Sequence, residues 1–310
     1  MQNKIKIASV SGPTGVGKTE TSLIIAKLMD AEIISADSMQ IYKYMNIGTA
    51  KPDVEERQGI VHHLMDFLSP DCDYSVADFN SDAKRVCESI VSRGKFPLIV
   101  GGTGLYIDSF LDGVEFGDGE KDLSYRKELE EIAGIKGNEY VHNMLSKVDP
   151  ESADSIHPNN LKRVIRALEI YKTSGVTKSE LDKLNKINES PYDFTKILFV
   201  REREELYRRI DIRVDMMLKC GLVDEVRYLM ENFRLSSTAS QAIGYKEVIS
   251  YLKDEITYDE MTELIKRDTR RYAKRQLTWF SRSEGINVVS LDSKTTQAVA
   301  DECIKIINSD

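Results

Sequence analysis

Short runs of apolar residues alternate along the chain with longer segments of helical period. The runs that predict strands are Ile5–Val10, Glu32–Ala36, Pro97–Val100, Lys196–Val200 and Ile286–Leu291. Apolar runs of this length are typical of strands that are buried on both faces. Because the intervening segments are long enough for helices, the order predicts an α/β fold with a parallel sheet flanked by helical crossovers.

The alternation stops near Phe116 and resumes near Pro191. The stretch between them is polar and has a helical period, with a turn signal at Gly117-Asp118-Gly119. We therefore expect an inserted helical subdomain at residues 116–190. The ranges on either side, 1–115 and 191–310, are expected to form one catalytic α/β domain whose C-terminal part is helical.

The composition is that of an ordinary globular protein. Hydrophobic residues make up 41% and charged residues 30% of the 310 residues, which is typical of soluble domains. No apolar run approaches the roughly 20 residues that span a bilayer. The chain opens almost directly on the first predicted strand, so we expect neither a secretory signal nor a membrane partner. We expect a monomer in the cytoplasm.

Cysteine and histidine form no recognisable metal or disulfide pattern. The four cysteines, Cys72, Cys87, Cys220 and Cys303, lie far apart and include no CxxC pair. This spacing fits free thiols in a reducing cytoplasm better than a disulfide framework or a zinc site. His62-His63 is not followed by a third ligand at metal spacing, which favours a structural pair.

Charge is distributed unevenly along the chain. The net charge of −8 argues mildly against a nucleic-acid partner, because binding to phosphates requires Lys and Arg. From Lys266 to Arg282, however, seven basic residues stand against one acidic residue, Asp268. In isolation this pattern favours a solvated helix face, but we expect the nearby acids to be too few to pair with the cations. A phosphate-binding surface that includes Arg271 and Lys274 stays open as the alternative.

The strongest local signal is a phosphate-binding loop, or P-loop. Its residues, Gly12, Pro13, Thr14, Gly15, Val16, Gly17, Lys18 and Thr19, fit the G-x-x-x-x-G-K-[ST] pattern. A predicted strand precedes the loop and a helical stretch follows it, as the pattern requires. Glycines let backbone N–H groups surround an anion, Lys18 adds a full charge, and Thr19 is placed to hold Mg²⁺. The loop predicts phosphate binding but does not identify the phosphate compound.

A carboxylate stands at the end of the second predicted strand. Asp37 follows Ile34-Ser35-Ala36, and ligands of open α/β sheets lie beyond the carboxyl ends of the strands. Three roles stay open for Asp37: a magnesium-side aspartate, a general base, or the N-cap of the next segment.

The third predicted strand ends in glycines instead of a carboxylate. In Gly101-Gly102-Thr103-Gly104, the glycines permit close approach of a ligand, and Thr103 offers a hydroxyl to a phosphate oxygen. A tight turn without a ligand is the alternative there. The missing carboxylate weakens the interpretation of the chain as an ordinary ATPase.

Several longer strings of residues are more specific than the P-loop alone. They are, in chain order, Gly12–Thr19, Ile34–Tyr42, Met45–Pro52, Tyr74–Phe79, Val100–Tyr106, Ile156–Asn160, Ala242–Glu247 and Arg271–Phe280. In these strings and in their order, the chain resembles the tRNA dimethylallyltransferase family over nearly its whole length. Departures are modest: Gly15 stands where the family often has alanine, and the segment after Gly117 matches weakly.

The resemblance implies a P-loop NTPase-like fold and a prenyltransferase that acts on the anticodon stem-loop of tRNA. The reaction would move a dimethylallyl group from dimethylallyl diphosphate to the N6 amine of the adenosine on the 3′ side of the anticodon. The tRNAs would be those that read codons beginning with U, and Mg²⁺ would assist. The resemblance further implies that Asp37 is the base, and that Thr103 and Arg209 are phosphate-side groups.

The same resemblance implies which residues contact tRNA. They are Asp37, Ser38, Met39, Gln40, Lys162, Arg163, Val164, Ile165, Arg166, Gln241, Ala242, Ile243, Gly244, Tyr245 and Lys246.

These residue types suit the implied chemistry. Negative charge grows on the leaving diphosphate, so fixed positive groups such as the loop amides and Lys18 would stabilise it. The adenine amine is a poor nucleophile that must lose a proton, and a strand-end carboxylate such as Asp37 suits that general-base role. The adenine must leave its stack to reach this carboxylate. A small-molecule P-loop kinase and an RNA-binding ATPase are the rival interpretations.

Overall fold

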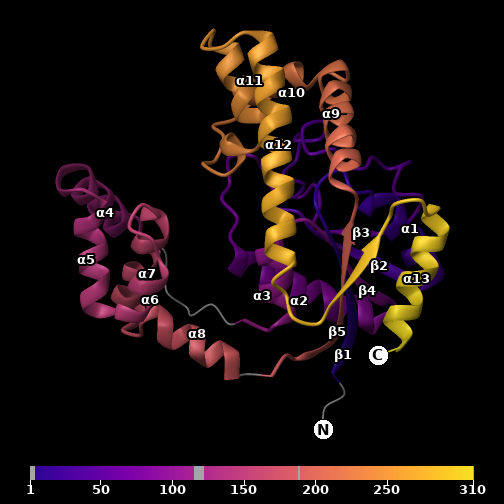
Figure 1. Ribbon diagram of the computed structural model, residues 1–310, viewed down its shortest axis with the longest axis horizontal. Coiled ribbons are helices and arrows are strands. Elements are labelled where there is room, and N and C mark those ends of the chain that lie inside the picture. The colour runs from indigo at the N-terminus through magenta and orange to yellow at the C-terminus, as the bar shows by residue number, and fades with distance from the viewer. Residues whose placement is uncertain (1–3, 115–121, 188, 310) are drawn as a thin grey trace. The chain divides into compact units, whose positions relative to one another are not determined.

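The computed structural model describes residues 4–114, 122–187 and 189–309. The chain divides into two compact units, of which the first combines residues 1–112 with residues 191–310 and the second comprises residues 113–190. The first unit contains a sheet with helices, and the second is helical (Figure 1). None of the helices in the described ranges combines the length and the apolar character that crossing a membrane requires.

A parallel sheet forms the centre of the first unit. Its strands are β1 (Ile5–Ser11), β2 (Ala31–Ala36), β3 (His62–His63), β4 (Phe96–Gly101), β5 (Tyr192–Val200) and β6 (Ile286–Ser290). Their order in space is β3-β2-β4-β1-β5-β6, and each of these neighbouring pairs is parallel. The predicted fold class, a parallel sheet flanked by helices, is confirmed. Because β1 is a central strand, the P-loop that follows it lies at the carboxyl ends of the strands, near the middle of the sheet.

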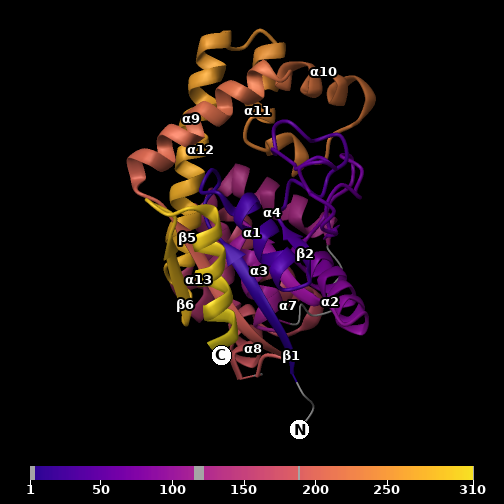
Figure 2. The ribbon, with the colours of Figure 1, turned by 90° about the vertical axis from the view of Figure 1, so that its right-hand side faces the viewer.

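Helices cover both faces of the sheet. On one face lie α1 (Lys18–Leu28) and α13 (Thr296–Ser309), and on the other lie α2 (Val76–Ser92) and α3 (Gly104–Leu111). Successive strand residues contribute to opposite cores: Ala8 and Ile33 pack with the first pair of helices, while Ile7 and Ile34 pack with the second. Figure 2 shows α13 running alongside the sheet. Burial on both faces explains why the strands read as continuous apolar runs.

The other helices that the structure describes in this unit form a bundle (Figure 1). They are α9 (Arg203–Lys219), α10 (Leu222–Asn232), α11 (Tyr245–Leu252) and α12 (Tyr258–Phe280), with the short 3-10 helix η1 (Ala239–Gln241). A third core cluster holds them together and includes Val226, Val248 and Ile265. At the far end of α12, Phe280 packs into the core beneath α2 and α3. The long helix α12 therefore ties the bundle to the sheet.

The predicted strands are confirmed to within a few residues at each end, and one strand was missed. β3 consists of two residues at the sheet edge, too short to produce a pattern in the sequence. His63 Nε2 lies 2.6 Å from Glu32 Oε2, and His62 Nδ1 lies 2.9 Å from the carbonyl oxygen of Ile60. No group of three His, Cys, Asp or Glu residues in the described ranges could hold a metal ion. Both histidines therefore take part in hydrogen bonds at this edge strand.

The second unit is built from helices that pack on one another. The described ones are α4 (Leu123–Lys136), α5 (Asn138–Val148), α6 (Pro150–Ser155), α7 (Leu161–Ser174) and α8 (Lys178–Ile187). Leu129, Val141 and Val164 belong to its apolar core. The turn predicted at Gly117-Asp118-Gly119 lies outside the described residues.

A buried carboxylate ties α4 to α7 in this unit. Glu169 is fully buried, and it accepts hydrogen bonds from Arg126 Nε and Nη2 at 2.7 Å and from the N–H of Asp122 at 3.0 Å. Arg166 also pairs with it. Burial alone would raise the pKa of Glu169, but the two arginines outweigh burial and hold the pKa below its ordinary value.

Replacing Glu169 with glutamine should destabilise the second unit by about 2 kcal/mol, because two charge-assisted pairs are removed. Since the folded-state pKa is lowered, the carboxylate stabilises the fold above its unfolded pKa of about 4.3. That contribution disappears as the pH falls through the folded value. Hydrogen exchange of α4 and α7 at neutral and acidic pH measures both effects. The exposed Glu128 on α4 supplies the matched control, Glu128→Gln; equal protection in the two variants would contradict the assignment.

Candidate functional site

The P-loop joins the end of β1 to the start of α1, and its glycines are required by its shape. Gly15 has φ +82° and Gly17 has φ +113°, a region that glycine adopts without strain. A Cβ at Gly12 would lie 2.8 Å from the carbonyl oxygen of Phe199, so a side chain has no room there. The loop therefore keeps its curl only with glycine at these positions.

Lys18 closes the loop on itself. Its Nζ donates to the carbonyl oxygens of Gly12 and Pro13 at 2.8 and 2.9 Å. These two bonds fix the first turn of the loop. The N–H groups open to an anion come from later in the loop, because Pro13 has no N–H and that of Thr14 donates to Gln276 Oε1.

Two arginines from the start of the helical bundle hold the middle of the loop. Arg209 Nε donates to the carbonyl oxygen of Gly15 at 2.9 Å. Arg201 Nε donates to that of Val16 at 2.8 Å, and its Nη1 donates to that of Leu291 at 3.2 Å. The structure thus places the predicted residue Arg209 against the P-loop, and it adds Arg201 beside it.

Lys18 shares its surroundings with one carboxylate and a further arginine. Burial lowers the pKa of Lys18 to about 8, while the charge of Asp37 opposes this shift and that of Arg213 adds to it. Burial also lowers the pKa of Arg213, with Asp37 opposing and Arg209 adding. Three cations and one carboxylate therefore act on one another at the P-loop. This excess of positive charge favours an anionic ligand.

Asp37 begins a tight turn at the carboxyl end of β2. Its Oδ1 accepts hydrogen bonds from the N–H groups of Met39 at 2.9 Å and Gln40 at 3.3 Å. The capping role that the sequence left open is therefore present. Because these bonds use Oδ1, the second oxygen, Oδ2, has no part in the cap. Asp37 can therefore hold its turn through Oδ1 while Oδ2 stays available to a ligand.

Thr103 fastens this turn to the loop after β4. The N–H of Ser38 donates to Thr103 Oγ1 at 3.1 Å, and the N–H of Thr103 donates to the carbonyl oxygen of Ala36 at 3.1 Å. Burial together with the charge of Asp37 raises the pKa of Tyr272 on α12 to about 12. The predicted residues Asp37 and Thr103 are thus brought together.

Helix α12 is packed directly against the loops of the site. Gln276 is buried; its Oε1 accepts from the N–H of Thr14 and its Nε2 donates to the carbonyl oxygen of Gly102, both at 2.9 Å. A Cβ at Gly102 would lie 2.2 Å from Gln276 Nε2, and one at Gly104 would lie 2.2 Å from Trp279 Cδ1. The absence of a side chain at these two glycines leaves room for Gln276 and Trp279 of α12. The sequence had instead suggested that a ligand approaches them closely.

Sequence reasoning missed Arg201, Arg213, Tyr272 and Gln276. A signal existed for one of them: Arg213 follows the predicted residue Arg209 by four positions, so the two share one face of α9.

Part of the basic stretch on α12 is neutralised by acids on α9. Lys266 Nζ lies 2.7 Å from Asp215 Oδ1, and Arg270 Nη1 lies 2.5 Å from Asp211 Oδ1. The nearby acids are too few for this pairing, and the partner of Arg270 lies 59 residues away in the sequence. Packing of α9 on α12 brings the charges together.

The second half of the stretch keeps its charge exposed. Lys274, Arg275 and Arg282 are exposed and form no ion pair with any residue that the structure describes. Arg271 is 62% exposed and lies 3.5 Å from Asp268, which Arg267 approaches more closely, at 2.9 Å. A basic surface therefore remains on the C-terminal half of α12.

The other residues expected to contact tRNA differ in exposure. Val164, Ile165, Ala242 and Tyr245 are buried in apolar cores, and Gly244 is buried as well. Their side chains are therefore unavailable to RNA, and they support the fold. Those on the surface or half-buried are Ser38, Met39, Gln40, Lys162, Arg163, Arg166, Gln241, Ile243 and Lys246.

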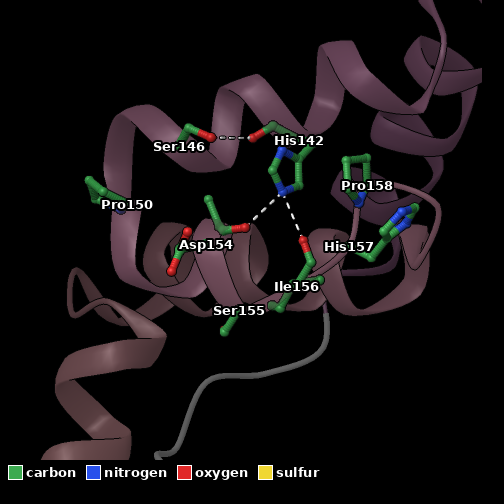
Figure 3. Close-up of a pocket in the computed structure, with 9 residues that line it drawn as sticks. His142, Ser146, Pro150, Asp154, Ser155, Ile156, His157 and Pro158 are labelled. Carbon is green, nitrogen blue, oxygen red and sulfur yellow. Dashed lines mark hydrogen bonds between the residues drawn. The ribbon is translucent and has the colours of Figure 1, made fainter.

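An open depression lies on the second unit (Figure 3). At its centre, His142 Nε2 lies 3.0 Å from the carbonyl oxygen of Ala153 and 2.8 Å from that of Ile156. Both partners are acceptors, so this nitrogen carries a proton and donates to both. Among the described residues that line the depression there is no Lys or Arg, so it offers no cation to a phosphate. Its histidine fastens the end of α6 to α5.

Comparison with known proteins relates the chain to enzymes that modify tRNA. The family model described as IPP transferase matches residues 40–283, and the one described as isopentenyl transferase matches residues 5–70. A tRNA dimethylallyltransferase of Alkaliphilus metalliredigens is 45% identical over 307 residues, which is 97% of each chain. The tRNA dimethylallyltransferase of Acetivibrio thermocellus is 50% identical over 284 residues, which is 91% of each chain.

Solved structures give the same relationship. The tRNA isopentenylpyrophosphate transferase from Bacillus halodurans is 41% identical and aligns with a TM-score of 0.74, covering 99% of this chain and 98% of its own. A eukaryotic dimethylallyltransferase, described as acting on tRNA, is 31% identical with a TM-score of 0.85 and covers 98% of this chain and 80% of its own.

Proposed function

Because the chain belongs to the IPP transferase family, we propose that it moves the dimethylallyl group of dimethylallyl diphosphate to the N6 amine of an adenosine in tRNA. It is a prenyltransferase that modifies tRNA. The acceptor that we propose is the adenosine on the 3′ side of the anticodon, in tRNAs that read codons beginning with U. The observation that carries the proposal is that the loop after β4 hydrogen-bonds to the Asp37 turn and, through Gln276, to the P-loop, which brings the carboxylate of Asp37 near Lys18.

The proposed step exchanges one bond for another. The bond between C1 of the dimethylallyl group and the diphosphate oxygen breaks, and its electron pair leaves with the diphosphate. The N6 lone pair of adenine forms the new bond to C1. The proton that N6 loses passes to Asp37, for which we assign Oδ2, because Oδ1 accepts hydrogen bonds from the backbone.

The cations at the P-loop would bind the diphosphate and stabilise its growing charge. The P-loop supplies N–H groups and Lys18, while Arg209 and Arg213 add two guanidinium groups that accompany Lys18. Groups fixed in place before the reaction need no reorganisation when the charge develops. Thr103 holds the turn of Asp37 through the N–H of Ser38, so we give it a positioning role beside any contact with phosphate.

The donor set fits a Mg²⁺ ion that is bound mainly through the substrate. Thr19 lies in the first turn of α1, where its hydroxyl could ligate the metal, and no cluster of three carboxylate, His or Cys ligands is present among the described residues. Mg²⁺ keeps several waters and binds through few protein groups plus phosphate oxygens. When bound there, it would supply positive charge to the leaving diphosphate.

We assign contacts with the RNA backbone to exposed cations on each unit. On the first unit these are Arg271, Lys274 and their neighbours on α12, and on the second unit they are Lys162 and Arg163 at the start of α7. Bases of an anticodon loop can be splayed out, which lets the adenine reach a carboxylate at the edge of a sheet.

Replacing both Arg271 and Lys274 with glutamine should flatten the salt dependence of tRNA binding. The slope of log affinity against log salt should fall by about 0.7 to 0.9 for each phosphate that the variant no longer neutralises. The matched control exchanges Lys266 and Arg270 for glutamine, because these cations on the same helix are already paired with Asp215 and Asp211. If the slope is unchanged in the first variant, or changes equally in both variants, the RNA-binding surface lies elsewhere on the chain.

The proposed function is tested with radiolabelled dimethylallyl diphosphate and bulk tRNA. Label should enter the RNA, and ATP should not be consumed. A chain that leaves the RNA unlabelled, but phosphorylates a small acceptor with ATP, is a kinase. Hydrolysis of ATP that RNA stimulates would instead support the RNA-dependent ATPase.

A further inference from the structure

After the Asp37 turn, the chain forms a second turn at residues 46–49. One carboxylate holds this turn in place. Glu225 of α10 accepts hydrogen bonds from the N–H groups of Asn46 at 2.9 Å, Ile47 at 2.8 Å and Gly48 at 3.1 Å. Successive N–H groups that converge in this way form a concave site for an anion. Here the anion is a side chain of the protein itself, from a residue about 180 positions later in the chain.

Tyr245 closes the same turn from the other side. Its hydroxyl donates to Glu225 Oε1 at 2.7 Å. A Cβ at Gly48 would lie 2.4 Å from Cε2 of this ring, so the backbone rests directly on the tyrosine. The turn is therefore clamped between a half-buried carboxylate and a buried ring.

The far end of this turn reaches the candidate site. The carbonyl oxygen of Thr49 accepts a hydrogen bond from Arg213 Nη2 at 3.3 Å and another from Gln40 Nε2 at 3.2 Å. Arg213 is the guanidinium whose charge acts on Lys18 and Asp37. Gln40 is the last residue of the Asp37 turn. One carbonyl group thus anchors both a cation and the turn that carries the carboxylate.

Arg213 needs such an anchor because its neighbours include like charges. Arg209 and Lys18 both repel it, and only Asp37 attracts it within this group. A long side chain with like charges beside it keeps one position when a hydrogen-bond acceptor fixes it. The Thr49 carbonyl is an acceptor of this kind, and its position depends on the turn.

We propose that Glu225 is a positioning residue for the reaction: its carboxylate fixes the turn of residues 46–49, and this turn holds Arg213 beside Asp37 and Lys18. The inference rests on the proposed function for the role of Arg213 toward the diphosphate. Glu225 itself touches neither the P-loop nor Asp37. It acts through the backbone of the turn.

The test replaces Glu225 with glutamine and measures the binding of inorganic pyrophosphate by calorimetry, together with kcat and KM for dimethylallyl diphosphate. Glutamine keeps the shape but turns an NH₂ group toward backbone donors. Affinity for pyrophosphate should fall about tenfold, a typical coupling for residues of one hydrogen-bond network. The matched control is Glu231→Gln, an exposed acid on the same helix, which should bind as the unmodified chain does.

The decisive comparison repeats Glu225→Gln in a chain that already carries Arg213→Gln. If Glu225 acts through Arg213, the second substitution should cause no further loss of pyrophosphate affinity. Equal losses in both backgrounds would overturn the proposal, because the carboxylate would then act elsewhere. If the glutamine variant does not fold, Tyr245→Phe removes one hydroxyl from the same clamp and enters the same comparison, with a loss of about threefold expected.

The outcome is separable from that of the proposed function. A chain that binds pyrophosphate but leaves tRNA unlabelled contradicts the prenyl transfer and still reports on the coupling of Glu225 with Arg213. A chain that prenylates tRNA, with additive losses in the two variants, contradicts the positioning role alone.

Discussion

Replacing Asp37 with asparagine should lower kcat for prenyl transfer about a hundredfold to ten-thousandfold, the range that general-base catalysis typically contributes. Asparagine has nearly the same shape, and its amide oxygen can still accept the hydrogen bonds from Met39 and Gln40 that Asp37 Oδ1 receives. The turn should therefore persist. What the variant loses is the ability to take a proton from the adenine amine.

Binding of tRNA to this variant should stay within about twofold of the unmodified chain, because a group that acts on proton transfer contributes mainly to the transition state. Single-turnover kinetics gives the rate of the chemical step, and filter binding gives the affinity. Thermal unfolding serves as the control for the turn. A variant with intact turnover and weakened tRNA binding would assign Asp37 to recognition instead of catalysis.

Replacing Lys18 with methionine should raise KM for dimethylallyl diphosphate and lower kcat together, with about a hundredfold to thousandfold loss in kcat, as for other preorganised charge-stabilising groups. Lys18 bridges the carbonyl groups of Gly12 and Pro13, and its charge would meet the diphosphate in both the ground state and the transition state. Methionine keeps much of the length and the apolar stem but removes the charge.

Steady-state kinetics with saturating tRNA separates the two parameters. The matched control is Lys27→Met at the end of the same helix, an exposed lysine whose Nζ donates to Gln58. This control should leave KM and kcat unchanged. If Lys18→Met also left both at the values of the unmodified chain, the P-loop would not be the diphosphate site.

Much of the fold could be predicted from the sequence because its signals are local. Strands buried on both faces appear as apolar runs such as Ile5–Ser11, and the helices between them have the lengths of crossovers. The P-loop was equally readable, since its function requires fixed residue types at fixed spacing. The two-residue strand β3 could not be found, because its pairing with β2 is decided by packing and not by a run of its own residues.

The site was predicted only in part, for a physical reason. Asp37 and Thr103 stand at strand ends, where the topology of the sheet dictates their location. Gln276 contacts Thr14 across 262 positions of sequence, and no local pattern specifies which face of a helix will meet a loop so distant. The acids on α9 that pair with Lys266 and Arg270 of α12 were missed for the same reason. Pairings of this kind follow from helix packing, which a single sequence does not display.

Glu225 is a further residue whose role could not be predicted from the sequence. In the sequence it is one of several acids on an amphipathic helix, with no motif around it. In the fold, three backbone N–H groups converge on it, and the turn that it organises reaches Arg213. A residue that acts by holding backbone N–H groups has no sequence motif of its own. Its role can be recognised only from the hydrogen bonds in the structure.

We propose Asp37 as a base opposite a diphosphate held by Lys18. Mass analysis of tRNA nucleosides after incubation with dimethylallyl diphosphate tests this most directly when the unmodified chain and Asp37→Asn are compared. The unmodified chain should yield adenosine that carries one dimethylallyl group on N6, and the variant should yield almost none under the same conditions. Absence of the modified nucleoside from both reactions, or an equal yield from the variant and the unmodified chain, would contradict this assignment.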